Sequence, residues 1–409
     1  MTRFMKLFLS LAAMSCHCGL AQELQVSYTT ELQSDFKQGS NWVNLLRLDF
    51  THSLGKHTTL QASTISTART RTESLADDFQ TFSNIEEENH PLALATLGVQ
   101  QQFGHSSLFF GIRNLNEDYF TSPATSLFTN SSCGIFPTLS ADYQIANYPV
   151  ASVGLHYELQ FTRWSLQASV YNGKGYYRFA GKENVFRFCP QQDGILSVTS
   201  LNYQHHDSNY HVGFALHSGM YMDYEEGTPQ KTEKERRKII WGYAEQRLAP
   251  GLHALLQGSF QSGASRGCKS YAGAGLTWQC GKTEGGLFTD YARFSPSYEW
   301  ASEFTWKIPC SGNGFIQPTL HFIQQAGAHY LIGLLRFSYV LPATRHLLFY
   351  DKFISKQETA GLRIDISLHA YVTSLTATCP VIRLNGQLFV RNGQCSSDGF
   401  QKCIFFSIV

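Results

Sequence analysis

Apolar and polar side chains alternate along most of the chain from residue 25 to residue 341, and this alternation predicts β-strands. Leu46, Leu48 and Phe50, for example, are separated by Arg47 and Asp49. Successive side chains of a strand point to opposite faces, so each such segment has one apolar face and one polar face. Clusters of Gly, Asn, Asp, Ser and Pro separate these segments, and helical periodicity is almost absent. We therefore expect an all-β fold.

The same pattern recurs in residues 108–113, 164–171, 299–308 and 335–341. A soluble sandwich buries the apolar faces in a shared core, whereas a membrane barrel turns them to lipid and encloses a wet, polar lumen. Periodicity alone does not separate these folds. Trp and Tyr near strand ends, and connections that are either tight or very long, favour the barrel. At ~10 residues per strand plus loops, residues 22–341 predict a transmembrane antiparallel β-barrel of about 16 strands.

The N-terminal segment has the layout of a secretory signal peptide: basic residues, an apolar run over residues 7–14 and a small-residue exit at Ala21. We expect a signal peptide over residues 1–21. A lipoprotein signal acylated at Cys16 is the alternative, which the bulky Met14 disfavours. The chain leaves the cytoplasm in both cases. A barrel exported in this way is expected in the outer membrane of a Gram-negative bacterium, surrounded by membrane lipid.

Composition narrows the classes of protein and partner. Charged residues make up 15% of the chain, against a usual ~25%. Beyond the N-terminal segment no run approaches the ~20 apolar residues of a membrane-spanning helix, so any membrane span must be built from strands. The formal net charge of +1 gives no indication of a nucleic-acid partner.

Long connections are expected over residues 67–89, 114–148 and 223–238. The last contains a run of mixed charges at residues 231–238, for which we expect a solvated loop or a short helix. Binding of a polyanion is the alternative, and the mixed signs disfavour it.

Eight cysteines follow the signal segment, an even number that permits disulfides outside the cytoplasm without giving their pairing. They are Cys133, Cys189, Cys268, Cys280, Cys310, Cys379, Cys395 and Cys403. None of these cysteines has the CxxC spacing that is typical of zinc sites. His205, His206, Asp207 and His211 could gather a metal, but their place at neighbouring strand ends favours a solvated turn. Residues 281–283 lack the first glycine of a phosphate loop. We expect no metal and no cofactor.

Three blocks of sequence resemble the carbohydrate-selective porins of the OprB type. They are residues 118–134 (DYFTSPATSLFTNSSCG) with 148–155 (YPVASVGL) and 170–173 (VYNG), residues 241–248 (WGYAEQRL), and residues 298–309 (YEWASEFTWKIP) with 315–323 (FIQPTLHFI). The blocks follow the family's order. The resemblance implies a 16-stranded antiparallel barrel, often a homotrimer, that passes sugars passively without a cofactor. It also implies that the connection at residues 114–148 folds inward as a constriction loop.

The chain departs from the family pattern after Leu341, because a porin of this kind normally ends with its last strand. Residues 333–341 have the pattern of such a strand, yet residues 342–409 follow. Within them, residues 381–390 surround an Asn-Gly pair and predict a hairpin. We expect residues 22–341 to form the barrel and residues 342–409 to be a C-terminal extension, either a small appended unit or extra translated sequence.

A selective passage for sugars needs polar side chains beside aromatic ones, because a sugar has hydroxyl groups that donate and accept hydrogen bonds and C–H faces that stack on rings. The alternation places candidate pore-lining residues on the lumen face at Arg113, Glu245, Arg247, Glu299, Glu303, His321 and Arg336. The constriction loop adds Glu117, Asp118, Tyr119, Phe120 and Asn130. Alternatively, these charges pair and pin the loop to the wall. The two interpretations are compatible, because opposed charges also create a transverse field.

The sequence therefore predicts a non-enzymatic porin for passive diffusion of carbohydrates and other small solutes. A closed outer-membrane barrel with a structural or adhesion role is the first alternative. The second is an outer-membrane hydrolase that uses His217 and Ser218. No acid-bearing motif accompanies these two residues, which disfavours the hydrolase.

Overall fold

The computed structural model describes residues 22–37, 39–225, 228–234, 236–262, 267–310, 312–345, 381–384 and 387–390. The expected signal peptide lies outside the described residues, as do Cys379, Cys395, Cys403 and most of the expected C-terminal extension. The chain divides into two compact units, Met1–His346 and Leu347–Val409.

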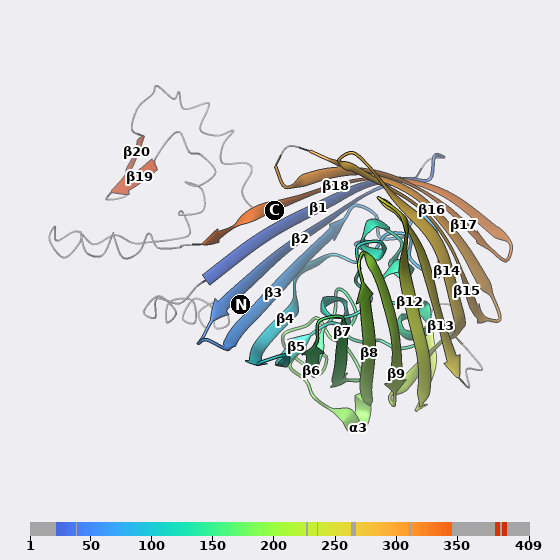
Figure 1. Ribbon diagram of the computed structural model, residues 1–409, viewed down its shortest axis with the longest axis horizontal. Coiled ribbons are helices and arrows are strands. Elements are labelled where there is room, and N and C mark those ends of the chain that lie inside the picture. The colour runs from blue at the N-terminus through green and yellow to red at the C-terminus, as the bar shows by residue number, and fades with distance from the viewer. Residues whose placement is uncertain are drawn as a thin grey trace. The chain divides into compact units, whose positions relative to one another are not determined.

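Within the described residues, sixteen strands form one closed antiparallel barrel (Figure 1), which confirms the expected fold class. They are β1 (Gln22–Ser34), β2 (Ser40–Ser53), β3 (Thr58–Arg69), β4 (His90–Phe103), β5 (Ser106–Arg113), β6 (Ser152–Gln160), β7 (Trp164–Asn172), β8 (Ile195–His205), β9 (Ser208–His217), β12 (Arg237–Ala249), β13 (Leu252–Ser262), β14 (Gly267–Cys280), β15 (Thr283–Ser295), β16 (Tyr298–Pro309), β17 (Gly314–Gln325) and β18 (Ala328–Arg345). The ring closes where β1 pairs with β18, for example Glu31 opposite Arg336. Closure leaves no sheet edge unpaired, as a lipid environment requires.

The two faces of the wall differ as the alternation predicts. On β16, Glu303 is 1% exposed and the next residue, Phe304, is 46% exposed. On β17 the same contrast separates His321 from Phe322, at 0% and 48%. Large apolar side chains therefore point away from the lumen, as expected of a barrel wall that faces lipid, and polar side chains point inward.

The two ends of the barrel differ in the length of their connections. At one end, turns as short as residues 104–105 and 206–207 join consecutive strands, and β1 begins and β18 ends there. The other end carries the connections at residues 70–89, 114–151 and 173–194. We call these ends the short-turn end and the long-loop end.

Two further pairs of strands form separate two-stranded sheets. β10 (Met220–Glu225) and β11 (Thr228–Lys234) form a hairpin between β9 and β12. The expectation of a loop or short helix over residues 231–238 is therefore wrong: the mixed charges do not prevent a strand where an antiparallel partner pairs its backbone. β19 (Val381–Leu384) and β20 (Gln387–Val390) pair with each other, as the hairpin prediction for residues 381–390 requires.

Short helical turns occur in the long connections. They are the 3-10 turns η2 (Leu115–Glu117), η3 (Thr125–Leu127) and η4 (Ser131–Cys133), and the single-turn helices α2 (Pro137–Ser140) and α3 (Pro190–Asp193). In the described part of the chain, no helix has the length and apolar character needed to cross a membrane.

The connection at residues 173–194 packs on the outside of the wall. Ile112 shares the outward face with Phe110, which is 64% exposed, yet Ile112 itself is 3% exposed. Tyr176 and Val185 of this connection bury it together with Leu94 of β4. This part of the outer surface of the wall is therefore covered by the chain itself.

Candidate functional site

The connection at residues 114–151, here the inner loop, lies inside the ring of strands (Figure 1). Its apolar side chains explain this position, because they need an apolar surface to bury. The Phe120 ring lies 4.5 Å from the Trp241 ring of β12, and the Phe136 ring 5.1 Å from the Tyr271 ring of β14. All four side chains are at most 3% exposed. Such aromatic pairs contribute about 0.5–1.5 kcal/mol each beyond their buried area, so they fix the loop firmly against one side of the wall.

Two wall carboxylates accept hydrogen bonds from the backbone of the inner loop. Glu303 of β16 accepts the N–H groups of Thr129 and Asn130 at 2.8 and 2.9 Å. Glu245 of β12 accepts the N–H of Ala124 at 2.7 Å and a hydroxyl bond from Ser122. An ionised acceptor makes stronger hydrogen bonds than a neutral one, and these bonds satisfy donors that no regular element pairs.

A second loop, residues 70–89, is held in the same way. Glu299 of β16 accepts the N–H groups of Phe79 and Gln80 at 2.6 and 3.1 Å. Asp290 of β15 accepts the amide groups of Gln80 at 3.0 Å and of Asn130 at 3.2 Å. Asp290 thus contacts both loops, and the two loops brace each other through one buried side chain.

The closing pair of strands contributes a buried ion pair to this support. The Arg336 Nε of β18 donates to Glu31 of β1 at 2.7 Å, and its Nη2 donates to Asn84 of the second loop at 2.7 Å. Ser83 donates its hydroxyl to Glu31 at 2.7 Å. Burial of Arg336 therefore does not leave its charge uncompensated.

Two arginine–carboxylate pairs at the start of the inner loop remain partly exposed. Arg47 of β2 donates to Glu117 through Nη1 at 2.8 Å and Nη2 at 2.9 Å, and the two side chains are 28% and 16% exposed. Arg113 of β5 donates to Asp118 at 2.6 and 2.7 Å, with exposures of 13% and 5%. Each pair is bidentate, which fixes both the position and the direction of the guanidinium group.

Two carboxyl groups of the second loop are perturbed by burial. Burial raises the pKa of Asp78, and the neighbouring Glu299 carboxylate raises it further. Burial likewise raises the pKa of Glu87 to about 7. The charge at this end of the barrel therefore changes near neutral pH.

The structure separates the candidate residues named from the sequence into three groups. Buried beneath or within the loops are Tyr119, Phe120, Asn130, Glu245, Glu299, Glu303, His321 and Arg336. In the partly exposed pairs are Arg113, Glu117 and Asp118. Arg247 lies at the short-turn end, where it pairs with Asp207 at 2.7 Å. Whether any of them touches a permeant stays a prediction.

Sequence reasoning missed four charged side chains of the wall that belong to these networks: Arg47, Asp49, Glu31 and Asp290. The alternation of Arg47 and Asp49 with apolar neighbours places both on the polar face, so the signal for these two was present. Nothing local marks Glu31 or Asp290 as loop contacts, because their partners lie 52 and 210 residues away.

The residues of the hydrolase alternative are engaged in structural hydrogen bonds. His217 Nε2 lies 2.7 Å from the Gly173 carbonyl, and its Nδ1 accepts the N–H of Gly219 at 2.9 Å. Ser218 Oγ accepts the N–H of Ile195 at 3.0 Å. The imidazole is therefore occupied at both nitrogens and has none available to activate Ser218.

Metal and disulfide chemistry gain no support in the described part of the chain. There, no group of three or more His, Cys, Asp and Glu side chains is placed to bind a metal ion. The five cysteines within it, Cys133, Cys189, Cys268, Cys280 and Cys310, are all free thiols.

Comparison with known proteins agrees with the barrel fold. The model of the carbohydrate-selective porin family, OprB, matches residues 54–297, more than half of the chain. A search of curated protein sequences found no match to this chain.

Solved structures of porins are similar to the barrel. The high-pH structure of Pseudomonas putida OprB matches with a TM-score of 0.65 at 13% identity, over 82% of this chain and 97% of that one. The anion-selective porin of Comamonas acidovorans matches with a TM-score of 0.53 at 12% identity, over 79% and 99%. OmpT of Vibrio cholerae, in a trimer form, has a TM-score of 0.53 at 9% identity, over 78% and 99%.

Proposed function

This chain belongs to the carbohydrate-selective porin family, OprB, and from this premise we propose that small sugars cross its barrel past the partly exposed pairs Arg47–Glu117 and Arg113–Asp118. The protein is a porin of a Gram-negative outer membrane, and small solutes diffuse through it. Beyond this, we propose which residues contact the permeant.

The bidentate geometry of the two pairs carries this assignment. Each arginine is held by a carboxylate of the inner loop, yet Arg47 and Glu117 keep 28% and 16% of their side-chain surface exposed. A sugar hydroxyl can donate to the carboxylate and accept from the guanidinium at the same time. Gln61, which accepts from Arg113 Nη1 at 3.0 Å, adds an amide to the same region.

The buried carboxylates have a different role in this proposal. Glu245, Glu299 and Glu303 are at most 2% exposed, and their oxygens accept bonds from the two loops. We assign them the positioning of the two loops, the inner loop by Glu245 and Glu303 and the second loop by Glu299, so that they do not contact the permeant themselves.

Assembly as a homotrimer is part of the proposal. It is supported by the family and by the trimer form of the similar OmpT barrel. Crosslinking in detergent below the unfolding temperature, followed by electrophoresis, should give a band of three subunits. A monomer as the sole species would contradict it.

Liposome swelling tests the proposed permeant. We expect faster entry of monosaccharides than of size-matched zwitterionic amino acids, and the double variant Arg47→Ala/Arg113→Ala should reduce this preference. Arg247→Ala removes an arginine at the short-turn end and is the matched control. Equal entry of sugars and amino acids in the unaltered protein would leave a general pore and refute the carbohydrate assignment.

A further inference from the structure

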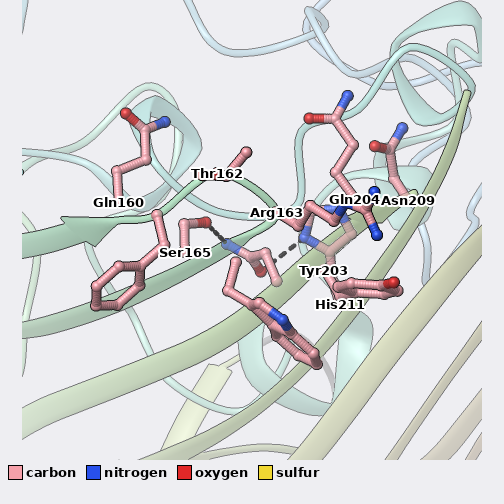
Figure 2. Close-up of a pocket in the computed structure, with 11 residues that line it drawn as sticks. Gln160, Thr162, Arg163, Ser165, Tyr203, Gln204, Asn209 and His211 are labelled. Carbon is pink, nitrogen blue, oxygen red and sulfur yellow. Dashed lines mark hydrogen bonds between the residues drawn. The ribbon is translucent and has the colours of Figure 1, made fainter. Parts of the chain in front are cut away.

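A cavity of about 160 Å³ lies at the short-turn end, lined by the adjoining ends of β6, β7, β8 and β9. Its lining includes the polar side chains of Gln160, Ser165, Asn202, Gln204, Asn209 and His211, and Figure 2 draws the lining residues as sticks. This volume holds several water molecules or one sugar ring. None of these side chains belongs to the arginine–carboxylate pairs described above.

The register places this cavity on the lumen side of the wall. Ser165 lies opposite Asn202, and Asn202 lies opposite His211, and residues directly opposite in adjacent strands share a face. Gln167 lies two residues after Ser165, on the same face, and donates to the Asp118 carbonyl of the inner loop at 3.1 Å. The cavity therefore lies between the inner loop and the short-turn opening.

The polar groups of the cavity are held in place before any ligand arrives. The Asn202 amide donates to Ser165 Oγ at 3.0 Å and to Gln167 Oε1 at 3.1 Å, and its oxygen lies 2.7 Å from His211 Nδ1. The His211 ring stacks on the Tyr243 ring at 4.1 Å with an interplanar angle of 14°. A ligand would therefore meet a fixed pattern of donors and acceptors, which lowers the entropy cost of binding.

One network joins the cavity to the inner loop. Asn209 donates to Glu245 Oε2 at 2.9 Å, and the other oxygen of Glu245 accepts the N–H of Ala124. The cavity and the constriction are thus positioned by the same carboxylate, and a solute that leaves the constriction on this side meets these side chains next.

The chemistry of the cavity matches a neutral sugar. Amides, a hydroxyl and an imidazole each pair with groups that both donate and accept, as sugar hydroxyls do. Arg163, at the turn between β6 and β7, is the one charged side chain among the residues that line it. This contrasts with the paired charges beside the inner loop.

We propose that this cavity is a second sugar-binding station, which receives a neutral monosaccharide after the constriction and before release at the short-turn end. The inference rests on the proposed function, since it requires that sugars enter the lumen. Two successive sites favour passage when each binds its solute weakly enough to release it to the next.

Single-channel recording with glucose tests the station. Glucose added to the short-turn side of a channel of known orientation should produce brief current blocks. Gln160 of β6 and Gln204 of β8 line the cavity and are exposed, and the double variant Gln160→Ala/Gln204→Ala removes both amides. Loss of two hydrogen bonds should weaken the block from this side about tenfold, with the open-channel conductance retained.

The matched control is Gln279→Ala, which removes an exposed amide from the inner face of β14 at the same end of the barrel. It should leave the block unchanged. Equal block in the unaltered protein and the double variant would refute the second sugar-binding station while leaving the porin function intact. Block of the unaltered protein by gluconate but not by glucose would refute it as well. Absence of conductance in the unaltered protein would instead refute the proposed function.

Discussion

Buried carboxylates that accept backbone N–H groups are the recurring device at the residue scale. Glu245, Glu299 and Glu303 each hold a loop segment that has no regular secondary structure. The alternation correctly places all three on the inner face of the wall. Their burial could not be predicted, because it depends on the path of loops that are distant in sequence and lack a local periodic signal.

The first prediction concerns Glu303. In Glu303→Gln a neutral amide keeps one acceptor oxygen for the N–H groups of Thr129 and Asn130, so the bonds weaken and one donor loses its partner. The free energy of unfolding in detergent should fall by about 1–3 kcal/mol, measured by urea titration.

The matched control is Glu284→Gln on β15, where the carboxylate is 48% exposed and pairs with Lys307 at 3.5 Å. An exposed pair of this kind contributes less than about 1 kcal/mol. Equal losses in the two variants would contradict the role given to Glu303.

A second prediction concerns charge selectivity. Arg47→Ala leaves Asp49 and Glu117 without their cation, so the region becomes more negative. The cation-to-anion permeability ratio from reversal potentials in a KCl gradient should rise, on the order of twofold. A shift toward anions in Arg47→Ala would contradict this prediction. An equal change in Arg247→Ala would also contradict it, because the effect would then not be specific to the position of Arg47.

A third prediction follows from the pKa of Glu87 near 7. The carboxyl is ionised at pH 8 and neutral at pH 6, so acidification removes a negative charge from the long-loop end. Cation selectivity should therefore fall between pH 8 and pH 6, and Glu87→Gln should show a smaller fall. A pH response that is identical in the variant would show that another group titrates.

At the scale of elements, strands and loops differ in how far the sequence predicts them. Most strands alternate over nine or more residues, which is enough for the period of two to mark them. The sequence did not predict β10 and β11, because the run of mixed charges at residues 231–238 indicated a solvated segment. The antiparallel pairing of the two strands across the hairpin determines the structure there instead. The inner loop was expected to fold inward from the family resemblance, and its aromatic contacts with Trp241 and Tyr271 explain why it does.

The two loops should be coupled through Asp290, which is the fourth prediction. Asp290→Ala removes the acceptor of both Gln80 and Asn130, so the second loop should open more often. Chymotrypsin should cut near Phe79, which is 42% exposed, about tenfold faster, equivalent to ~1.4 kcal/mol in local opening.

Asp207→Ala serves as the control for this coupling. It removes an exposed carboxylate at the short-turn end, 63% exposed, and should leave the cleavage rate unchanged. An unchanged rate in Asp290→Ala would mean that the aromatic contacts alone hold the loops.

For the whole molecule, the strand count and the two-sided wall could be predicted from the sequence, because both follow from the alternation and the length of the chain. The first and last strands of a closed antiparallel barrel must pair, but the register of this closing pair could not be derived in this way. β1 and β18 meet through the backbone register and through the Glu31–Arg336 ion pair, whose members are 305 residues apart.

The central claim is that this barrel, although lined by two inward-packed loops, remains an open path for small solutes. Conductance of the purified, folded protein in a planar lipid bilayer tests it most directly. We predict stable, ohmic current steps that small sugars reduce reversibly. A protein that inserts as a folded barrel but gives no steps would contradict the account and leave the closed-barrel alternative.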